Sequence, residues 1–153
     1  MERESESEGE RAARLRVVLW RANKAVEQLE SLRLNERGLC MSDFAILEVL
    51  LHKGSLPVNT IGQKVLLTSG SITAAVRRLQ DRGLLTKEVD ALDRRISRVS
   101  LTADGRALIE RDYREHMICL REITGALSAQ EQRQLHELLK KLGLHAAALL
   151  RRD

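Results

Sequence analysis

Residues 68–85 read TSGSITAAVRRLQDRGLL, in which four small polar or glycine residues stand directly before a stretch that carries paired arginines. At the helical step of about 100° per residue, one face of this stretch is apolar. That face holds Ile72, Ala75, Val76 and Leu79. The opposite face holds Gly70, Thr73, Ala74, Arg77 and Asp81, flanked by Ser71 and Arg78. We therefore expect an amphipathic helix that Thr68 or Ser69 caps and that Gly83 ends.

Small side chains crowd the first turn of the exposed face, and the arginines follow one turn later. This order suits a helix that enters a DNA groove by its N-terminal end. Small residues permit close approach, hydroxyls and backbone N–H groups meet phosphates, and arginine reaches a guanine edge. The candidate DNA contacts are Ser69, Gly70, Ser71, Thr73, Ala74, Arg77 and Arg78. For an isolated helix, arginines on a solvated surface are the better explanation, so the neighbouring segments decide.

A two-stranded β-wing is predicted directly after this helix, from residues 84–89 and 97–101. The connection between the strands carries Asp93-Arg94-Arg95 and lacks the Asn-Gly or Asp-Gly pair of a tight turn. A hairpin tipped with arginine suits the narrow, electronegative minor groove of DNA. Its candidate DNA contacts are Arg94, Arg95 and Arg98. When this tip is taken alone, a solvated turn is the better explanation, but a recognition helix and a basic wing at this spacing together favour DNA binding.

Apolar spacing predicts further helices on both sides of this motif. Their expected bounds are residues 11–32, 42–54, 57–65, 102–127 and 128 onward. Ser42 and Thr102 are the expected N-caps of the helices at 42–54 and 102–127, and Ser128 with Glu131 forms a capping box for the last.

The predicted fold class is mostly α, a winged helix-turn-helix with long N- and C-terminal dimerisation helices and a two-stranded β wing. Four regions are expected: an acidic, disordered arm at 1–10, an N-terminal dimerisation helix and connector at 11–41, a DNA-binding domain at 42–105, and C-terminal dimerisation helices at 106–153. The apolar stripes of the terminal helices exceed what one small module covers, so we expect a homodimer.

The composition favours a polyanionic partner and excludes several classes of protein. The 153 residues carry a net charge of +4, and without residues 1–10 they hold 25 basic against 17 acidic side chains. No apolar run approaches the roughly 18 residues of a membrane span and no signal-peptide core is present, so we expect a cytoplasmic protein without a membrane partner. G-x-S-x-G, G-x-x-x-x-G-K-[ST] and H-E-x-x-H motifs are absent, so neither enzymatic activity nor a cofactor is expected.

Residues 67–85, followed by Asp93-Arg94-Arg95 and Leu101-Thr102-x-x-Gly105, resemble the MarR family of bacterial transcriptional regulators. The resemblance extends from Trp20 to Leu142. The stretch MSDFAILEVLLHKGSLPVNTIGQKVLLTSGSIT is more similar to the branch that includes quinone- and hydroquinone-responsive members. It implies a triangular homodimer with intertwined terminal helices that binds double-stranded DNA at a pseudo-palindromic operator. Each subunit would place a recognition helix in the major groove and a wing in the minor groove.

The resemblance also implies roles for single residues. Arg95 resembles the wing arginine that enters the minor groove, and Asp93 resembles the acidic residue that steadies the wing through a basic partner. The recognition-helix positions are Ser69, Ser71, Thr73 and Arg77. Arg77 stands where many close relatives carry an acidic residue, and Gln80 stands where glutamate is common, so the operator sequence does not transfer. The acidic residues before Arg11 lie outside the resemblance.

Regulators of this family often hold small anionic or phenolic ligands between the dimer helices and the DNA-binding lobe, which implies a small-molecule effector site here. Its candidate wall is Trp20, Phe44, His52, Tyr113 and His116. Aromatic rings offer apolar contact, and histidine meets an acidic ligand. Ordinary core packing is the alternative for each of them.

Cys40 is a candidate for redox or electrophile sensing. A reactive thiol needs some exposure and a lowered pKa. Arg37 and the positive start of the second helix would provide the positive surroundings that favour a thiolate. A buried, inert cysteine is the alternative. His116 and Cys119 lie three residues apart, but two ligands do not make a zinc site, so helix packing is favoured and no metal is expected.

The leading interpretation is a dimeric repressor that a small phenolic or quinone-like ligand, or modification of a thiol, releases from DNA. A helical protein–protein interaction module and a metal-responsive regulator remain as alternatives.

Overall fold

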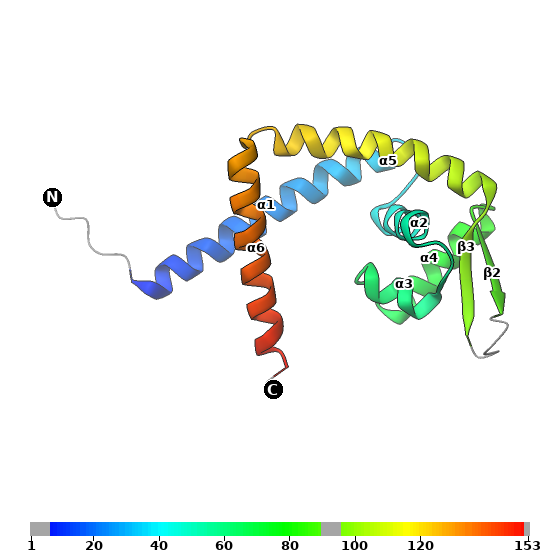
Figure 1. The fold of residues 1–153 in the computed structure, drawn as a ribbon, viewed down its shortest axis with the longest axis horizontal. Coiled ribbons are helices and arrows are strands. Elements are labelled where there is room, and N and C mark those ends of the chain that lie inside the picture. Colours follow the sequence, from blue (N-terminus) through cyan, green and yellow to red (C-terminus); the bar gives the residue numbers. More distant parts are fainter. Residues whose placement is uncertain (1–6, 90–95, 152–153) are drawn as a thin grey trace. The chain divides into compact units, whose positions relative to one another are not determined.

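The computed structural model describes residues 7–89 and 96–151. Over these residues the elements are α1 (Glu8–Asn35), α2 (Met41–Lys53), β1 (Leu56–Pro57), α3 (Val58–Lys64), α4 (Ser69–Asp81), β2 (Leu85–Val89), β3 (Ser97–Leu101), α5 (Ala103–Thr124) and α6 (Ala129–Leu149) (Figure 1). The chain divides into two compact units, Met1–His116 and Met117–Asp153, and the division falls within α5. The mostly helical winged helix-turn-helix of the prediction is confirmed.

The core of the first unit gathers apolar side chains from every helix of that unit and from the sheet. The members that are no more than 1% exposed are Leu34, Leu39, Phe44, Ile46, Leu47, Leu50, Ile61, Leu79, Val99 and Ile109. With aromatics at only 2% of the sequence, aliphatic side chains fill nearly all of this volume. Helices α2, α3 and α4 pack around it, and α4 also packs against β2.

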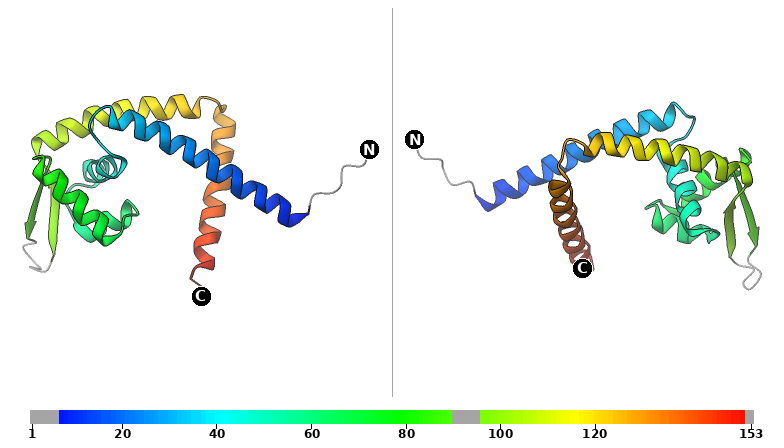
Figure 2. Two further views of the ribbon diagram at one scale, coloured as in Figure 1. Left: turned by 180° about the vertical axis from the view of Figure 1, so that it is seen from behind. Right: turned by 45° about the horizontal axis from the view of Figure 1, so that its top comes forward.

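The sheet has three antiparallel strands in the order β1-β3-β2, one strand more than the predicted wing. Strands β2 and β3 form the predicted hairpin, and Figure 2 shows them side by side. The added strand is the pair Leu56–Pro57, which lies against Val99 and Arg98. A two-residue strand has no alternation to recognise, and proline belongs at a sheet edge because it cannot donate to the ladder. No local pattern therefore indicates this strand, and the sequence predicts only that Pro57 opens a helix.

Thr102 and Gly105 join the end of the α4 region to the start of α5. Thr102 Oγ1 donates to the Gly83 carbonyl oxygen (2.7 Å) and accepts from the Gly105 N–H (2.9 Å), which confirms Thr102 as a cap. A Cβ atom at Gly105 would lie 2.0 Å from the Leu84 carbonyl oxygen. Only glycine permits this approach, so the Thr102-x-x-Gly105 motif fixes α5 against the turn that follows α4.

Two helix starts differ from the prediction. Helix α1 begins at Glu8, because Ser7 and Glu10 form a capping box that brings Glu8, Gly9 and Glu10 into the helix. The prediction that these three residues belong to a disordered arm is wrong, and residues 1–6 of that arm lie outside the described residues. Helix α2 begins at Met41 with Cys40 as its N-cap, and Ser42 is already helical.

The second unit contains the last turns of α5 and the whole of α6. Ser128 Oγ accepts from the Glu131 N–H (3.3 Å) and Glu131 Oε2 accepts from the Ser128 N–H (2.8 Å), which confirms the predicted capping box. No side chain of α6 is buried in the single chain. None of the described helices is long and apolar enough to cross a membrane.

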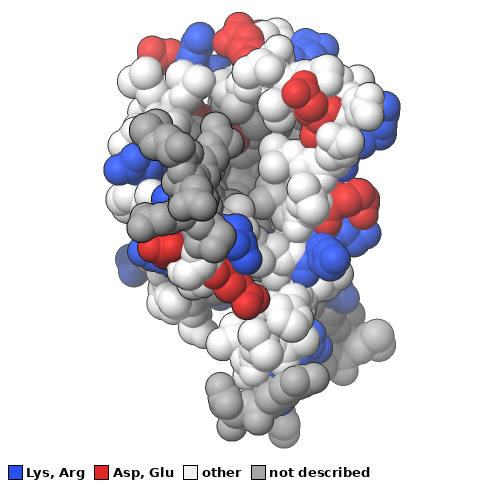
Figure 3. Space-filling model, turned by 90° about the vertical axis from the view of Figure 1, so that its left-hand side faces the viewer, with Lys and Arg blue, Asp and Glu red and all other residues white. Residues whose placement is uncertain are grey.

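On the face shown in Figure 3, basic and acidic side chains are interspersed, so the positive charge is not gathered into one patch on this side.

Candidate nucleic-acid interface

Helix α4 buries the stripe that its periodicity predicts. Ile72, Ala75, Val76 and Leu79 are at most 3% exposed. All the predicted DNA contacts of this helix have exposed side chains or backbone, namely Ser69, Gly70, Ser71, Thr73, Ala74, Arg77 and Arg78. The two faces are thus confirmed, and the DNA-binding roles of the individual residues remain predictions.

Hydroxyl groups organise the first turn of α4. Thr68 Oγ1 accepts from the Ser71 N–H (3.3 Å) and donates to Ser71 Oγ (2.9 Å), so Thr68 rather than Ser69 is the cap. Thr73 Oγ1 donates to the Ser69 carbonyl oxygen (2.9 Å). Helix geometry gives the first N–H groups, those of Ser69 and Gly70, no intrahelical acceptor. Together with the helix dipole they favour an anion such as a DNA phosphate.

Two hollows meet at the start of α4. A shallow groove follows the exposed face of the helix and is lined by Ser69, Gly70, Thr73, Ala74, Arg77, Arg78, Asp81 and Arg82. A second hollow lies among α3, α4 and the sheet and is lined by Val58, Asn59, Ser69, Ile72, Thr73, Lys87, Ile96 and Ser97. Lys87 and Asn59 were missed in the prediction from sequence, although the exposed lysine of a strand beside the recognition helix is a signal that could have found the first.

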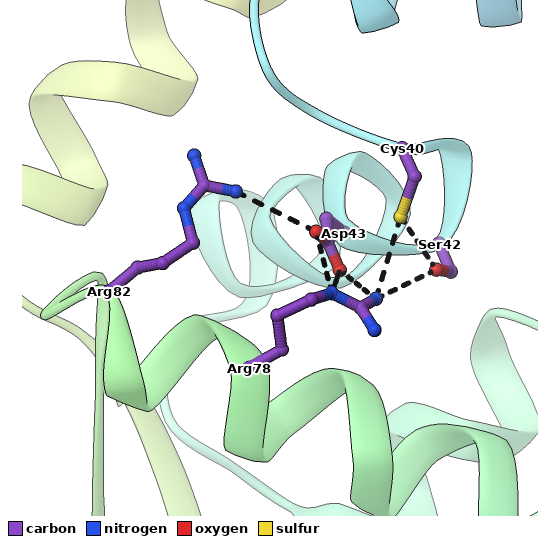
Figure 4. A network of polar contacts seen from close by, with 5 residues as sticks. All are labelled: Cys40, Ser42, Asp43, Arg78 and Arg82. Atoms are coloured by element: carbon purple, nitrogen blue, oxygen red, sulfur yellow. Dashed lines mark hydrogen bonds and ion pairs between the residues drawn. The ribbon is translucent and has the colours of Figure 1, made fainter.

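Arg78 reaches across to α2 and meets a buried acid. Its Nε lies 3.2 Å and 3.1 Å from the two carboxylate oxygens of Asp43, and its Nη2 also donates to Asp43 Oδ1 (Figure 4). Arg78 Nη2 further lies 3.4 Å from Ser42 Oγ and 3.5 Å from Cys40 Sγ. The hydrogen bonds to Asp43 raise the pKa of the Arg78 guanidinium, which stays charged. Arg82 Nη1 lies 3.7 Å from Asp43 Oδ2.

Asp43 and Arg82 were therefore missed as neighbours of the site. Asp43 sits in the apolar stretch that forms α2, and a charged residue at a buried position of such a helix is the signal that could have found it. Its partner residues lie more than thirty positions away in the sequence, so no local pattern identifies them.

In the described part of the wing, the Arg98 side chain forms a hydrogen bond within the protein. Its Nη1 donates to the Ser55 carbonyl oxygen (3.1 Å), beside the strand pairing of β1 and β3. Asp93, Arg94 and Arg95 lie outside the described residues, so their predicted roles stay predictions.

Four of the five candidate effector residues form two ring pairs between α2 and α5. The ring centroids of Phe44 and His116 are 4.5 Å apart, and those of His52 and Tyr113 are 5.0 Å apart in an edge-to-face arrangement. Phe44 is 1% exposed and His116 is 8% exposed. Trp20 lies apart from them on α1, where it is 58% exposed beside Arg16, Val17 and Arg21.

The two cysteines have different surroundings. Cys40 is half-buried, and its Sγ lies 3.1 Å from Ser42 Oγ; Cys119 is buried. Among the residues that the structure describes, no three histidine, cysteine or acidic side chains gather in a way that could hold a metal ion. His116 instead places Nε2 3.5 Å from Glu30 Oε1.

Helices α3 and α4 form a helix-turn-helix, in which α4 is the exposed second helix. Together with the adjoining hairpin of β2 and β3, they define a winged helix-turn-helix DNA-binding protein. A sequence profile described as the MarR family matches residues 37–96. The HTH-type transcriptional regulator MhqR of Bacillus subtilis (strain 168) is 35% identical over 137 residues, which cover 90% of this chain and 94% of MhqR.

Solved structures agree. A probable transcriptional regulator from Pseudomonas aeruginosa is 32% identical with a TM-score of 0.75, over 82% of this chain and 94% of that one. BpsR of Bordetella bronchiseptica, a protein whose DNA binding is regulated by 6-hydroxynicotinic acid, is 25% identical with a TM-score of 0.77, over 85% of this chain and 98% of that one. This chain belongs to the MarR family. It is a DNA-binding transcriptional regulator and not an enzyme, in a family whose members are generally dimeric.

Proposed function

We propose that this protein is a dimeric repressor that sets α4 in the major groove of each half of a pseudo-palindromic operator. A phenolic or quinone-like ligand, or modification of a thiol, releases it. The observation that carries the DNA contact is the groove on α4, where small side chains line the first turn and Arg77 follows. The proposed division of labour gives residues 42–105 to DNA and residues 11–41 and 106–153 to dimerisation.

Exposed apolar side chains on the terminal helices support the dimer. In the single chain, Leu138 and Leu144 of α6 are 65% and 61% exposed, and Leu15 and Val18 of α1 are 57% and 64% exposed. Such a density of exposed aliphatic side chains is typical of an interface rather than of a solvated surface. A second copy of the chain is the covering partner that a two-fold operator requires.

Two observations support a release mechanism. The rings of Phe44, His52, Tyr113 and His116 lie between α2, which is part of the DNA-binding region, and α5, which leads out of it. BpsR, a relative in fold and sequence, responds to a hydroxylated aromatic acid, which is the class of ligand that such rings and imidazoles suit. For the thiol route, an adduct on Cys40 Sγ would lie against Arg78 of the recognition helix.

Selection of bound DNA from a random duplex pool tests the DNA-binding part. We expect one enriched inverted repeat with half-sites about 10 base pairs apart, and affinity that falls steeply with salt. Arg77→Ala is expected to weaken binding and to relax sequence preference at one position of each half-site, as loss of a base contact does. A pool without any enriched sequence at low ionic strength would contradict the proposal.

Release is tested on the selected operator with hydroquinone, benzoquinone and 6-hydroxynicotinic acid, each against wild type and Cys40→Ser. A reversible ligand in the ring site lowers the affinity of both proteins equally. Thiol modification lowers that of the wild type alone and persists after the compound is removed. If none of the three compounds changes the affinity of either protein, the release mechanism is wrong while the DNA-binding proposal stands.

A further inference from the structure

Asp43 is a buried acid whose two basic partners are Arg78 in the recognition helix and Arg82 at the C-cap of that helix. Its side chain is 3% exposed, whereas those of Arg78 and Arg82 are 46% and 36% exposed. Both arginines also line the groove on the exposed face of α4. Figure 4 shows both guanidinium groups reaching from α4 toward the carboxylate. They therefore lie between a buried negative charge and the surface that we assign to DNA.

The geometry divides the donors of Arg78 into two sets. Nε and Nη2 face α2, where they meet Asp43, Ser42 and Cys40. Nη1 takes no part in these contacts. Because the guanidinium group is planar, fixing one edge by two hydrogen bonds also fixes the direction of the other donors.

A fixed arginine binds an anion at a lower entropic cost than a flexible one. Long side chains lose much rotamer freedom when they are immobilised, and a carboxylate that already holds the guanidinium removes that loss from the binding step. Arg82 follows Arg78 by four residues, so the two side chains are neighbours on the helix surface. The pair thus offers two partly exposed positive charges, one turn apart, at the C-terminal half of α4.

We infer that Asp43 is a positioning residue for DNA binding, which orients Arg78 and Arg82 to bind the DNA phosphate backbone. Arg77, for which the described residues offer no such anchor, is left to read bases. The inference rests on DNA binding through α4. It predicts that Asp43 acts on affinity for every sequence alike, because phosphate contacts fix the register of a protein on the duplex and carry no sequence information.

A purely electrostatic role gives the opposite sign. A carboxylate near DNA repels phosphates, so its neutralisation would strengthen binding and leave the phosphate contacts intact. A positioning role means that neutralisation weakens binding even though a negative charge has been removed. Asp81, an exposed acid on α4 that lines the same groove, provides the matched control.

The experiment measures operator and random-sequence dissociation constants for full-length wild type, Asp43→Asn and Asp81→Asn over a series of salt concentrations. We expect Asp43→Asn to weaken affinity about tenfold for both DNAs. The slope of log affinity against log salt should become shallower by about 0.9 for each phosphate that the variant no longer neutralises. Asp81→Asn is expected to bind both DNAs more tightly than wild type, because it removes a negative charge from the groove without releasing an arginine. Circular dichroism and sedimentation establish that each variant is folded and has the wild-type oligomeric state.

Arg78→Lys is the second variant, which decides the question if Asp43→Asn does not fold. It keeps the net charge, but lysine cannot span the carboxylate with two donors and still present an oriented group to DNA. We expect affinity to fall about fivefold with an unchanged preference for the operator over random DNA. Asp43→Asn and Arg78→Lys proteins that bind with wild-type affinity and slope would overturn the inference. Failure of the wild type itself to bind would instead overturn the assignment of α4 to DNA.

Discussion

Leu66 occupies a backbone conformation that is unfavourable for its side chain. Its φ is +56°, within the left-handed region, and its side chain is 91% exposed in the turn between α3 and α4. This region costs a non-glycine residue roughly 1–2 kcal/mol, and so exposed a side chain recovers little by packing. The residue lies beside the cap of the recognition helix, so its strain bears on the element that we assign to DNA.

Leu66→Gly is therefore expected to stabilise the protein. The relief of strain exceeds the greater backbone freedom that glycine has in the unfolded chain, and the net gain should be about 0.5–1 kcal/mol. Urea unfolding monitored by circular dichroism measures it. Gly9→Ala, in the first turn of α1 where an added Cβ meets nothing within 4 Å, is the comparison, with an expected gain of at most about 0.8 kcal/mol. A less stable Leu66→Gly protein would show that the leucine has contacts that its exposure conceals.

Glu30 and the buried His116 form a largely enclosed pair that makes stability depend on pH. The Glu30 side chain is 14% exposed and lies 3.5 Å from His116 Nε2. Burial raises the pKa of Glu30, the charges of Glu27 and Glu48 raise it further, and His116 opposes the rise. Because the folded-state pKa is above the unfolded one, the contribution to stability is complete below the unfolded pKa and is lost as pH rises through the folded pKa.

Glu30→Gln, which does not titrate, should gain stability relative to wild type as pH increases from about 4 toward neutrality. Urea unfolding of both proteins at half-unit pH steps measures this difference. Glu27→Gln on the same helix has the opposite sign, because hydrogen bonds from Lys24 and Asn23 lower the pKa of Glu27. Its wild-type advantage is lost as pH falls. Parallel pH profiles for the two variants would contradict this account.

At the scale of the element, the sequence predicted what depends on local pattern. The buried stripe of α4, the caps at Thr102 and Ser128 and the two strands of the hairpin follow from spacing and side-chain chemistry within a few residues. The start of α2 was not predicted correctly, because Cys40 and Ser42 are both possible N-caps in the sequence. In the structure the Ser42 hydroxyl contacts Arg78 instead of capping the helix.

The candidate site shows the same limit. Exposure of Ser69, Thr73 and Arg77 was predictable from helical periodicity. The contact between Arg78 and Asp43 joins residues 35 positions apart, and the contact between Arg98 and Ser55 joins residues 43 positions apart. Such pairings depend on how elements pack, and one sequence contains no period that reports them. Helical periodicity thus identified the exposed surface, but it could not show which arginines also form contacts within the protein.

Substitutions of Thr68 test how much the N-cap of α4 contributes to stability. Its hydroxyl oxygen accepts from the Ser71 N–H, so Thr68→Ala leaves that donor without a side-chain partner. We expect a loss of about 1 kcal/mol in the free energy of unfolding, the usual cost of removing an N-cap. Thr68→Ser retains the hydroxyl and should stay close to wild type. Thermal and urea unfolding of the three proteins make the comparison, and equal stability of all three would mean that solvent caps the helix as well as threonine does.

At the scale of the whole molecule, the two units differ in how well they bury their own apolar side chains. The first unit buries its own core, with ten of its described aliphatic and aromatic side chains no more than 1% exposed. In α6 of the second unit the structure describes no buried side chain, although leucines recur along the helix. The leucines of α6 that stay exposed are Leu135, Leu138, Leu139, Leu142, Leu144 and Leu149. Such a helix is stable in water only when another apolar surface covers it.

Leu138→Asp tests whether a second copy supplies that cover. Burial of a leucine contributes roughly 1.5–3 kcal/mol, and a buried unpaired carboxylate is unfavourable, so the dimer dissociation constant should rise by at least about tenfold. Sedimentation velocity over a concentration series measures it. Lys140→Glu, which also adds negative charge but changes a polar position of α6, should remain dimeric. Because an operator with two half-sites needs both heads, Leu138→Asp is expected to lose operator affinity at low concentration and to recover part of it when the protein concentration is raised. A wild type that sediments as a monomer at every concentration would contradict the dimer itself.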